Sequence, residues 1–186
     1  MERSERARRH VHRAYASAHL AAATRALVIA AAMFVVALGL YRVTRSTVLV
    51  ALTLGAVMAT FAWRGGGWRR GAFAGVLAGL PPLVMPSITW TLSSSAGHCT
   101  NCVAQAAWPA MLTCFGTSSL VGILVGYRAI GEAAPRRYAL AAIPTAALTG
   151  LLGCGTTGLG GATGVVVGLV AGGVAGWLVA MRAAHA

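Results

Sequence analysis

Residues 71–127 read GAFAGVLAGLPPLVMPSITWTLSSSAGHCTNCVAQAAWPAMLTCFGTSSLVGILVGY and contain no Asp, Glu, Lys or Arg. A stretch this long and this apolar does not suit a surface in water, so we expect it to lie in a membrane. Near its centre, His98-Cys99-Thr100-Asn101-Cys102 forms a short polar break between two apolar runs. The stretch therefore predicts two membrane spans joined by a loop that carries reactive side chains.

The remainder of the chain has the same character. Hydrophobic residues make up 58% of the 186 residues and charged residues only 10%, against about 25% charged in soluble proteins, and the mean hydropathy is +0.74. Apolar runs near the roughly 20 residues of a spanning helix predict an all-α bundle of about six transmembrane helices. We expect a cytoplasmic Arg-rich arm at 1–24 and one transmembrane domain at 25–182. The expected spans are 25–41, 47–63, 71–92, 103–127, 138–154 and 160–181.

The basic residues indicate how the spans are oriented. The net charge is +12, and all fifteen basic residues are arginines. Thirteen lie in the arm, in the second and fourth breaks between spans, or in the tail, and only Arg42 and Arg45 lie on the other side. This is the positive-inside pattern of membrane proteins. It predicts a bacterial inner-membrane protein with both termini in the cytoplasm, and it is a better explanation of the charge than nucleic-acid binding.

Small residues indicate how the helices pack. Glycines that recur every fourth residue let membrane helices approach closely, within one chain or between copies in an oligomer. In the third span, Pro81, Pro82 and Pro86 remove backbone donors, which predicts a kink. The longest glycine series lies in the sixth span and a shorter one opens the third: Gly160, Gly164, Gly168, Gly172 and Gly176; Gly71, Gly75 and Gly79.

The cysteines and one histidine form the candidate site. His98, Cys99 and Cys102 lie in the expected outer loop, and Cys154 lies at the expected outer end of the fifth span. Cys114 is about 18 Å below Cys102 at 1.5 Å per residue, so we expect it near the bilayer centre as a small apolar residue, separate from the other three.

Three interpretations of the outer group stay open. Cys99 or Cys102 could form a disulfide with Cys154, because the outer side of a bacterial membrane is oxidising. Cys99 and Cys102 could instead be a redox pair whose first thiolate is stabilised by a helix N-terminus. Finally, His98, Cys99, Cys102 and Cys154 have the ligand types and number for zinc or another soft metal.

The chain resembles the six-span membrane anti-sigma factors of bacteria. The matching parts are the Cys99–Cys102 loop and the run Pro135-Arg136-Arg137, which leads into an Ala/Gly-rich helix ending at Cys154. The resemblance implies a cytoplasmic N-terminal segment that binds a regulatory protein. In this chain, however, that segment is short, rich in arginine and lacks an evident apolar docking face. Membrane thiol oxidoreductases also place a Cys-x-x-Cys at the outer end of a span, but they need a second outer cysteine pair.

We therefore expect a sensor or regulatory protein that responds to redox state or metal at its outer face and passes the response to a cytoplasmic partner. The alternatives are a thiol–disulfide oxidoreductase and a small transporter of a soft metal or an uncharged solute. An ion-coupled carrier is disfavoured, because no acidic residue lies within an expected span. No pattern for hydrolysis, phosphoryl transfer or nucleotide binding is present, which disfavours an enzyme. The expected partners include membrane lipids and exclude nucleic acid.

Overall fold

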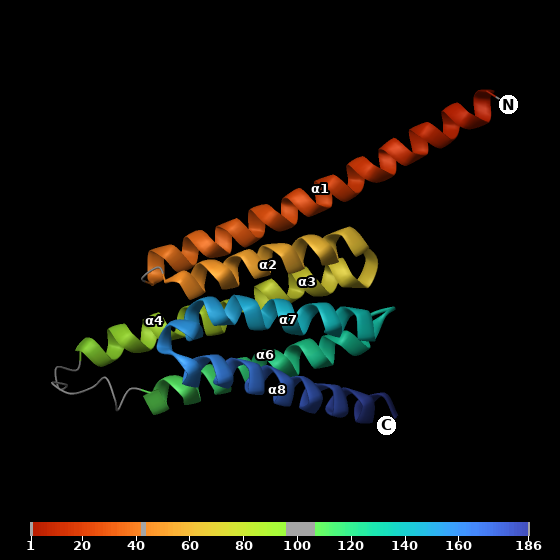
Figure 1. Ribbon diagram of the computed structural model, residues 1–186. Coiled ribbons are helices and arrows are strands. Elements are labelled where there is room, and N and C mark those ends of the chain that lie inside the picture. Colours follow the sequence, from red (N-terminus) through yellow and green to blue (C-terminus); the bar gives the residue numbers. More distant parts are fainter. Residues whose placement is uncertain (1, 42–43, 96–106, 186) are drawn as a thin grey trace.

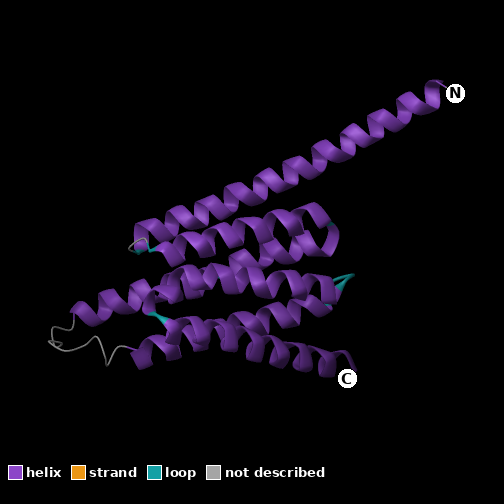
Figure 2. Ribbon diagram, viewed as in Figure 1, coloured by secondary structure: helices purple, strands orange, loops and turns teal. Residues whose placement is uncertain are grey.

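The structure is a computed structural model that describes residues 2–41, 44–95 and 107–185, and throughout these residues the only regular elements are helices (Figures 1 and 2). The fold class is therefore all-α, as the sequence predicts. The elements are α1 (Glu2–Leu40), α2 (Arg45–Arg64), α3 (Gly66–Ala78), α4 (Leu80–Ser95), α6 (Ala107–Ile130), α7 (Pro135–Cys154), the 3₁₀ turn η1 (Gly155–Thr157) and α8 (Leu159–His185).

Among the residues that the structure describes, six helical segments are long and apolar enough to cross a bilayer, as expected of a membrane protein. Large apolar side chains such as Val28, Leu52 and Leu124 are more than 60% exposed, as lipid-facing positions of a spanning bundle would be. The six segments are Ala16–Leu40, Arg45–Arg64, Gly66–Thr89, Met111–Ile130, Pro135–Thr157 and Leu159–Arg182.

The third span is interrupted where the prolines predict a kink. α3 ends at Ala78 and α4 begins at Leu80, with Gly79 between them. Pro81 and Pro82 have no N–H and fall in the first turn of α4, where a missing donor is tolerated. Pro81 and Pro82 thus lie at the N-terminal end of α4, where they do not interrupt its hydrogen bonds.

Glycines bring α8 against α6, as predicted. A Cβ added to Gly168 would lie 2.6 Å from the carbonyl oxygen of Phe115, and one added to Gly122 would lie 2.7 Å from the amide nitrogen of Gly173. Such distances leave no room for a side chain, so the two backbones are in direct contact. The glycines of α8 that face α6 are Gly164, Gly168, Gly172 and Gly176, whereas Gly160 has open space beside it.

α7 lies at the centre of the bundle and contacts α2, α3, α4, α6 and α8 (Figure 1). The glycines of α3 make one of these contacts, because a Cβ on Gly75 would collide with Thr145 and with the carbonyl group of Ala142. Another is made by Gly153, where a Cβ would collide with the backbone of Leu83 in α4. Among the described residues, both buried apolar clusters include residues of α7.

The bundle has two chemically different ends. We call one the basic end: it carries the α2–α3 turn, the α6–α7 connection and both termini (Figure 1). Its arginines include Arg64, Arg69, Arg70, Arg128 and Arg136. We call the other the cysteine end, because α7 finishes there at Cys154 and α8 begins beyond it. α4 finishes and α6 starts at the same end.

A buried disulfide as the candidate functional site

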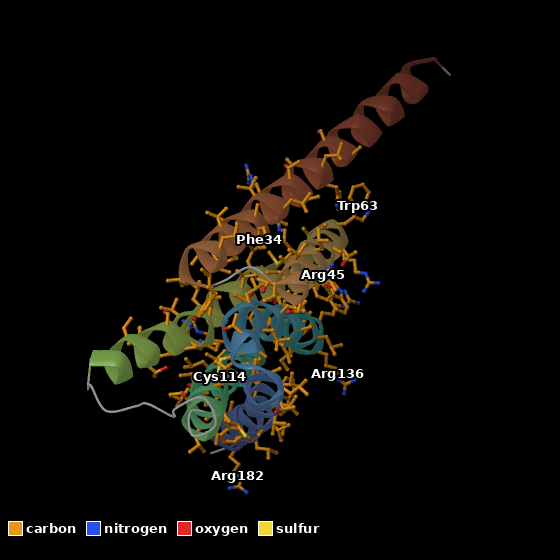
Figure 3. All side chains as sticks on the ribbon, turned by 60° about the vertical axis from the view of Figure 1, so that its left-hand side comes forward. Phe34, Arg45, Trp63, Cys114, Arg136 and Arg182 are labelled. Carbon is orange, nitrogen blue, oxygen red and sulfur yellow. A yellow bond between two sulfur atoms is a disulfide. The ribbon has the colours of Figure 1, made fainter. Side chains whose placement is uncertain are left out.

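A disulfide joins Cys114 of α6 to Cys154, the last residue of α7. The Cα atoms are 6.2 Å apart and the two residues are separated by 40 positions in the sequence. Both side chains are completely buried, and Figure 3 shows Cys114 inside the bundle. The bond is therefore a covalent link between two neighbouring helices in the interior of the protein.

This pairing corrects the expectation that Cys114 stands apart from Cys154. Cys114 is buried, as predicted, but it is not near the middle of its helix. α6 begins at Ala107, so Cys114 lies only about 10 Å along the helix from its start. Cys154 is also deeper than expected, because η1 and Gly158 continue beyond it before α8 begins. The two cysteines consequently lie at the same depth.

A backbone carbonyl of α4 lies against the disulfide. Cys154 Sγ is 3.2 Å from the carbonyl oxygen of Pro82. In a regular helix this oxygen would accept from the N–H four residues ahead, but that residue is Pro86, which has no N–H. The proline spacing therefore leaves an acceptor without its normal helical donor beside the sulfur atom.

The backbone of Leu83, the next residue of α4, is contacted on two sides. The hydroxyl of Tyr41, just beyond α1, donates to the carbonyl oxygen of Leu83 at 2.6 Å. Burial raises the pKa of this phenol above its usual value, so Tyr41 stays protonated and keeps donating. On another side, Gly153 of α7 packs against the Leu83 backbone. These contacts fix the segment of α4 that presents the Pro82 oxygen to Cys154.

The connection from α7 to α8 follows Cys154 directly at the cysteine end and is hydrogen-bonded to the last turn of α7. Thr156 Oγ1 donates to the Gly153 carbonyl at 2.6 Å, and Thr157 Oγ1 donates to the Cys154 carbonyl at 2.7 Å. Thr156 and Thr157 are exposed although Cys154 is buried.

Of the four residues predicted as a metal site, only Cys154 lies in the described part of the chain. His98, Cys99 and Cys102 fall outside it, so their metal or redox role stays a prediction. Within the described residues, no three His, Cys, Asp or Glu side chains gather as a metal site would require. While Cys154 is in the disulfide it has no thiolate to offer a metal.

Sequence reasoning missed Cys114 as a partner of Cys154. The signal was present in the order of the spans, because α6 and α7 are consecutive and antiparallel, so residues near the start of α6 lie close to the end of α7. In comparisons with protein families, curated proteins and solved structures, none matches this chain. The site's chemistry is therefore argued from its geometry: a cystine that two electrons and two protons convert into two thiols.

Proposed function

We propose that the protein is a membrane-embedded redox-responsive regulator whose sensing element is the Cys114–Cys154 pair. The observation that carries this proposal is the position of Cys154, with its sulfur beside a carbonyl oxygen that lacks a helical donor. The oxidised sulfur cannot donate a hydrogen bond, whereas a thiol can. In the reduced state, a thiol of Cys154 would therefore have an acceptor within hydrogen-bonding distance.

The reaction is a balanced thiol–disulfide conversion. A dithiol reductant transfers two electrons and two protons to the Cys114–Cys154 bond and becomes a disulfide itself, leaving two thiols in the protein. The thiol of Cys154 then donates to Pro82, and the covalent restraint between α6 and α7 is gone. A disulfide oxidant at the outer face takes up two electrons and two protons, becomes a dithiol, and so reverses each step.

The arrangement of the helices supports a response that reaches the opposite end. α6 is tightly packed on α8 through the glycine contacts, and α7 is packed on α3 and α4 in the same way. The disulfide joins these two groups at the cysteine end, where η1 and Gly158 also connect α7 to α8. At the basic end they are connected along the chain by the segment between Ile130 and Pro135. Releasing the bond allows the α6–α8 pair to shift against α7, which changes that segment.

The resemblance to membrane anti-sigma factors fits this reading, since such proteins pass an outer signal to a cytoplasmic regulatory partner. In our proposal the arginine-rich basic end faces the cytoplasm, and the cysteine end faces the oxidising outer side. The predicted loop with His98, Cys99 and Cys102 would then lie on the same side as the sensing pair. It could exchange disulfides with that pair or bind zinc or another soft metal.

The alternative of a thiol–disulfide oxidoreductase for protein substrates is less well supported. Such an enzyme presents an accessible thiolate to its substrate, whereas both sulfur atoms here are buried. A buried pair suits a small reductant or a local opening of the connection better than docking of a second protein.

The test uses a Cys99→Ser/Cys102→Ser background, so that only the proposed pair remains. In native membranes, reduction should speed tryptic cleavage at Arg128, Arg136 or Arg137, beside the α6–α7 connection. The control adds Cys114→Ser and Cys154→Ser, which should be cleaved at the fast rate with or without reductant. If cleavage of the background variant does not depend on reduction, the proposed regulation is wrong.

A further inference from the structure

A cleft at the basic end is lined by three arginines from two helices. It lies between α1 and α3, encloses about 410 Å³, and is bounded by Ala22, Arg25, Arg69, Arg70 and Phe73. Towards its N-terminus, α1 leans away from the rest of the bundle (Figure 1). We call this cleft at the basic end the arginine cleft. Three guanidinium groups around one hollow favour an anion with several oxygen acceptors, such as a phosphate.

A second cleft adjoins the first and differs from it in chemistry. It encloses about 350 Å³ and is lined by Thr24, Arg25, Val28, Ile29 and Phe73. Arg25 and Phe73 line both clefts, so the two are continuous. We call the second the apolar cleft. An anionic group bound among the arginines would thus have an apolar surface directly beside it, running along α1 towards the cysteine end.

Arg25 lies at a depth that suits the head of a lipid. It is 15 residues from Leu40, the end of α1, which is about 22 Å along the helix. The hydrocarbon core is about 30 Å thick, so Arg25 lies inside the spanning segment, one or two turns from its basic end. Arginines at such positions pair with an anionic group or extend their guanidinium group to the interface.

The described carboxylates of the protein do not supply this anionic group for Arg25. Arg70 pairs with Glu132 at 3.1 Å, but among the side chains that the structure describes, neither Arg25 nor Arg69 has a carboxylate partner. The other two acidic residues are Glu2 and Glu5. Glu5 precedes Arg25 by 20 residues on the same helix, which places it about 30 Å away. The cleft therefore has an excess of positive charge that an anion from outside the chain can neutralise.

We propose that these two clefts bind one anionic phospholipid from the leaflet at the basic end. Its phosphate lies among Arg25, Arg69 and Arg70, and an acyl chain lies along Val28, Ile29 and Phe73. Basic pockets between spanning helices are known to hold anionic lipid head groups. The apolar cleft distinguishes a phospholipid from a free phosphate ion, which would use only the arginines. The proposal does not depend on the redox function.

The experiment is native mass spectrometry of the full chain, purified in mild detergent, with added dioleoyl phosphatidylglycerol. The expected result is a one-to-one adduct that dioleoyl phosphatidylcholine forms at least several-fold less. Arg25→Gln and Arg69→Gln should each lower the phosphatidylglycerol adduct several-fold. Arg136→Gln is the matched control, because it removes an exposed arginine of the basic end that does not line the cleft.

Inorganic phosphate, added alone, distinguishes a phospholipid from a free phosphate ion as the bound anion. We expect it neither to form the adduct nor to displace the lipid at equal concentration. Displacement by phosphate would overturn the lipid assignment. Equal losses for Arg25→Gln and Arg136→Gln would also overturn it, because the effect would then follow net charge. Val28→Ser tests the acyl-chain position at an exposed residue, and an undiminished adduct in this variant would contradict that part of the proposal.

Discussion

Replacing Pro86 with Ala should make the Cys114–Cys154 disulfide harder to reduce. The new N–H lies one helical turn beyond the Pro82 carbonyl and can donate to it in both oxidation states. In the natural chain Pro86 has no N–H to give this oxygen, and the sulfur of Cys154, 3.2 Å away, can donate to it only as a thiol. The substitution therefore stabilises the oxidised state selectively, and the reduction potential should become more negative.

The size of the shift in reduction potential follows from one hydrogen bond. In the natural chain the thiol of Cys154 makes this bond to the Pro82 carbonyl only in the reduced state, and in the Pro86→Ala variant the new backbone N–H can make it in both states. A buried acceptor without a partner costs about 1–3 kcal/mol, and because a thiol is a weak donor we take the lower value of about 1 kcal/mol. For a two-electron couple, about 1.4 kcal/mol corresponds to 30 mV, so the expected shift is about 20 mV. The assay is equilibration with glutathione buffers in the Cys99→Ser/Cys102→Ser background, followed by thiol trapping.

Pro81→Ala is the matched control for this prediction. It restores an N–H in the same proline cluster, but the carbonyl four residues earlier belongs to Leu77 and not to Pro82. We expect its potential to stay at the value of the background variant. An unchanged or less negative potential for Pro86→Ala, or an equal shift in both variants, would refute the role of the Pro82 oxygen.

Three further predictions concern packing and orientation. Gly168→Leu should destabilise the bundle by about 1–3 kcal/mol in a denaturant titration, because the larger side chain must separate two backbones in contact. Val166→Leu, at a 45% exposed position, should leave the stability unchanged. Equal stabilities of the two variants would contradict the glycine contact. Tyr41→Phe should cost about 1–3 kcal/mol in the same titration, since the Leu83 carbonyl loses its donor; a variant as stable as wild type would show that this bond contributes nothing. A reporter fused after Ala96 should be external and one at the C-terminus cytoplasmic, and a shared side would contradict the proposed topology.

The fold could be predicted from the sequence because each of its signals is local. Hydropathy alone predicted a bundle of about six long apolar segments, and Pro81 and Pro82 indicated the break at Gly79. The glycine series of the sixth span identified the face that meets α6, because a helical repeat places every fourth residue on roughly one side. Gly160 shows the limit of this reasoning, since it belongs to the same series but has no neighbour.

The site could not be predicted in the same way, because it depends on how far one helix is displaced along another. The position of Cys114 within its span is a local property, but its depth relative to Cys154 depends on where α6 begins and how α7 ends. The arginine cleft has the same origin. In the sequence, Arg25 contributes only to the prediction of orientation. That it lines the same cleft as Arg69 depends on how α1 packs against α3.

The central claim is that Cys114 and Cys154 form a disulfide that opens and closes in the folded protein. The most direct measurement is maleimide labelling of the Cys99→Ser/Cys102→Ser variant in native membranes, before reduction, after mild reduction and after reoxidation. The account predicts no labelled cysteine, then two labelled cysteines, then none again. Labelling of both cysteines before reduction, or labelling only after the protein is unfolded, would contradict it.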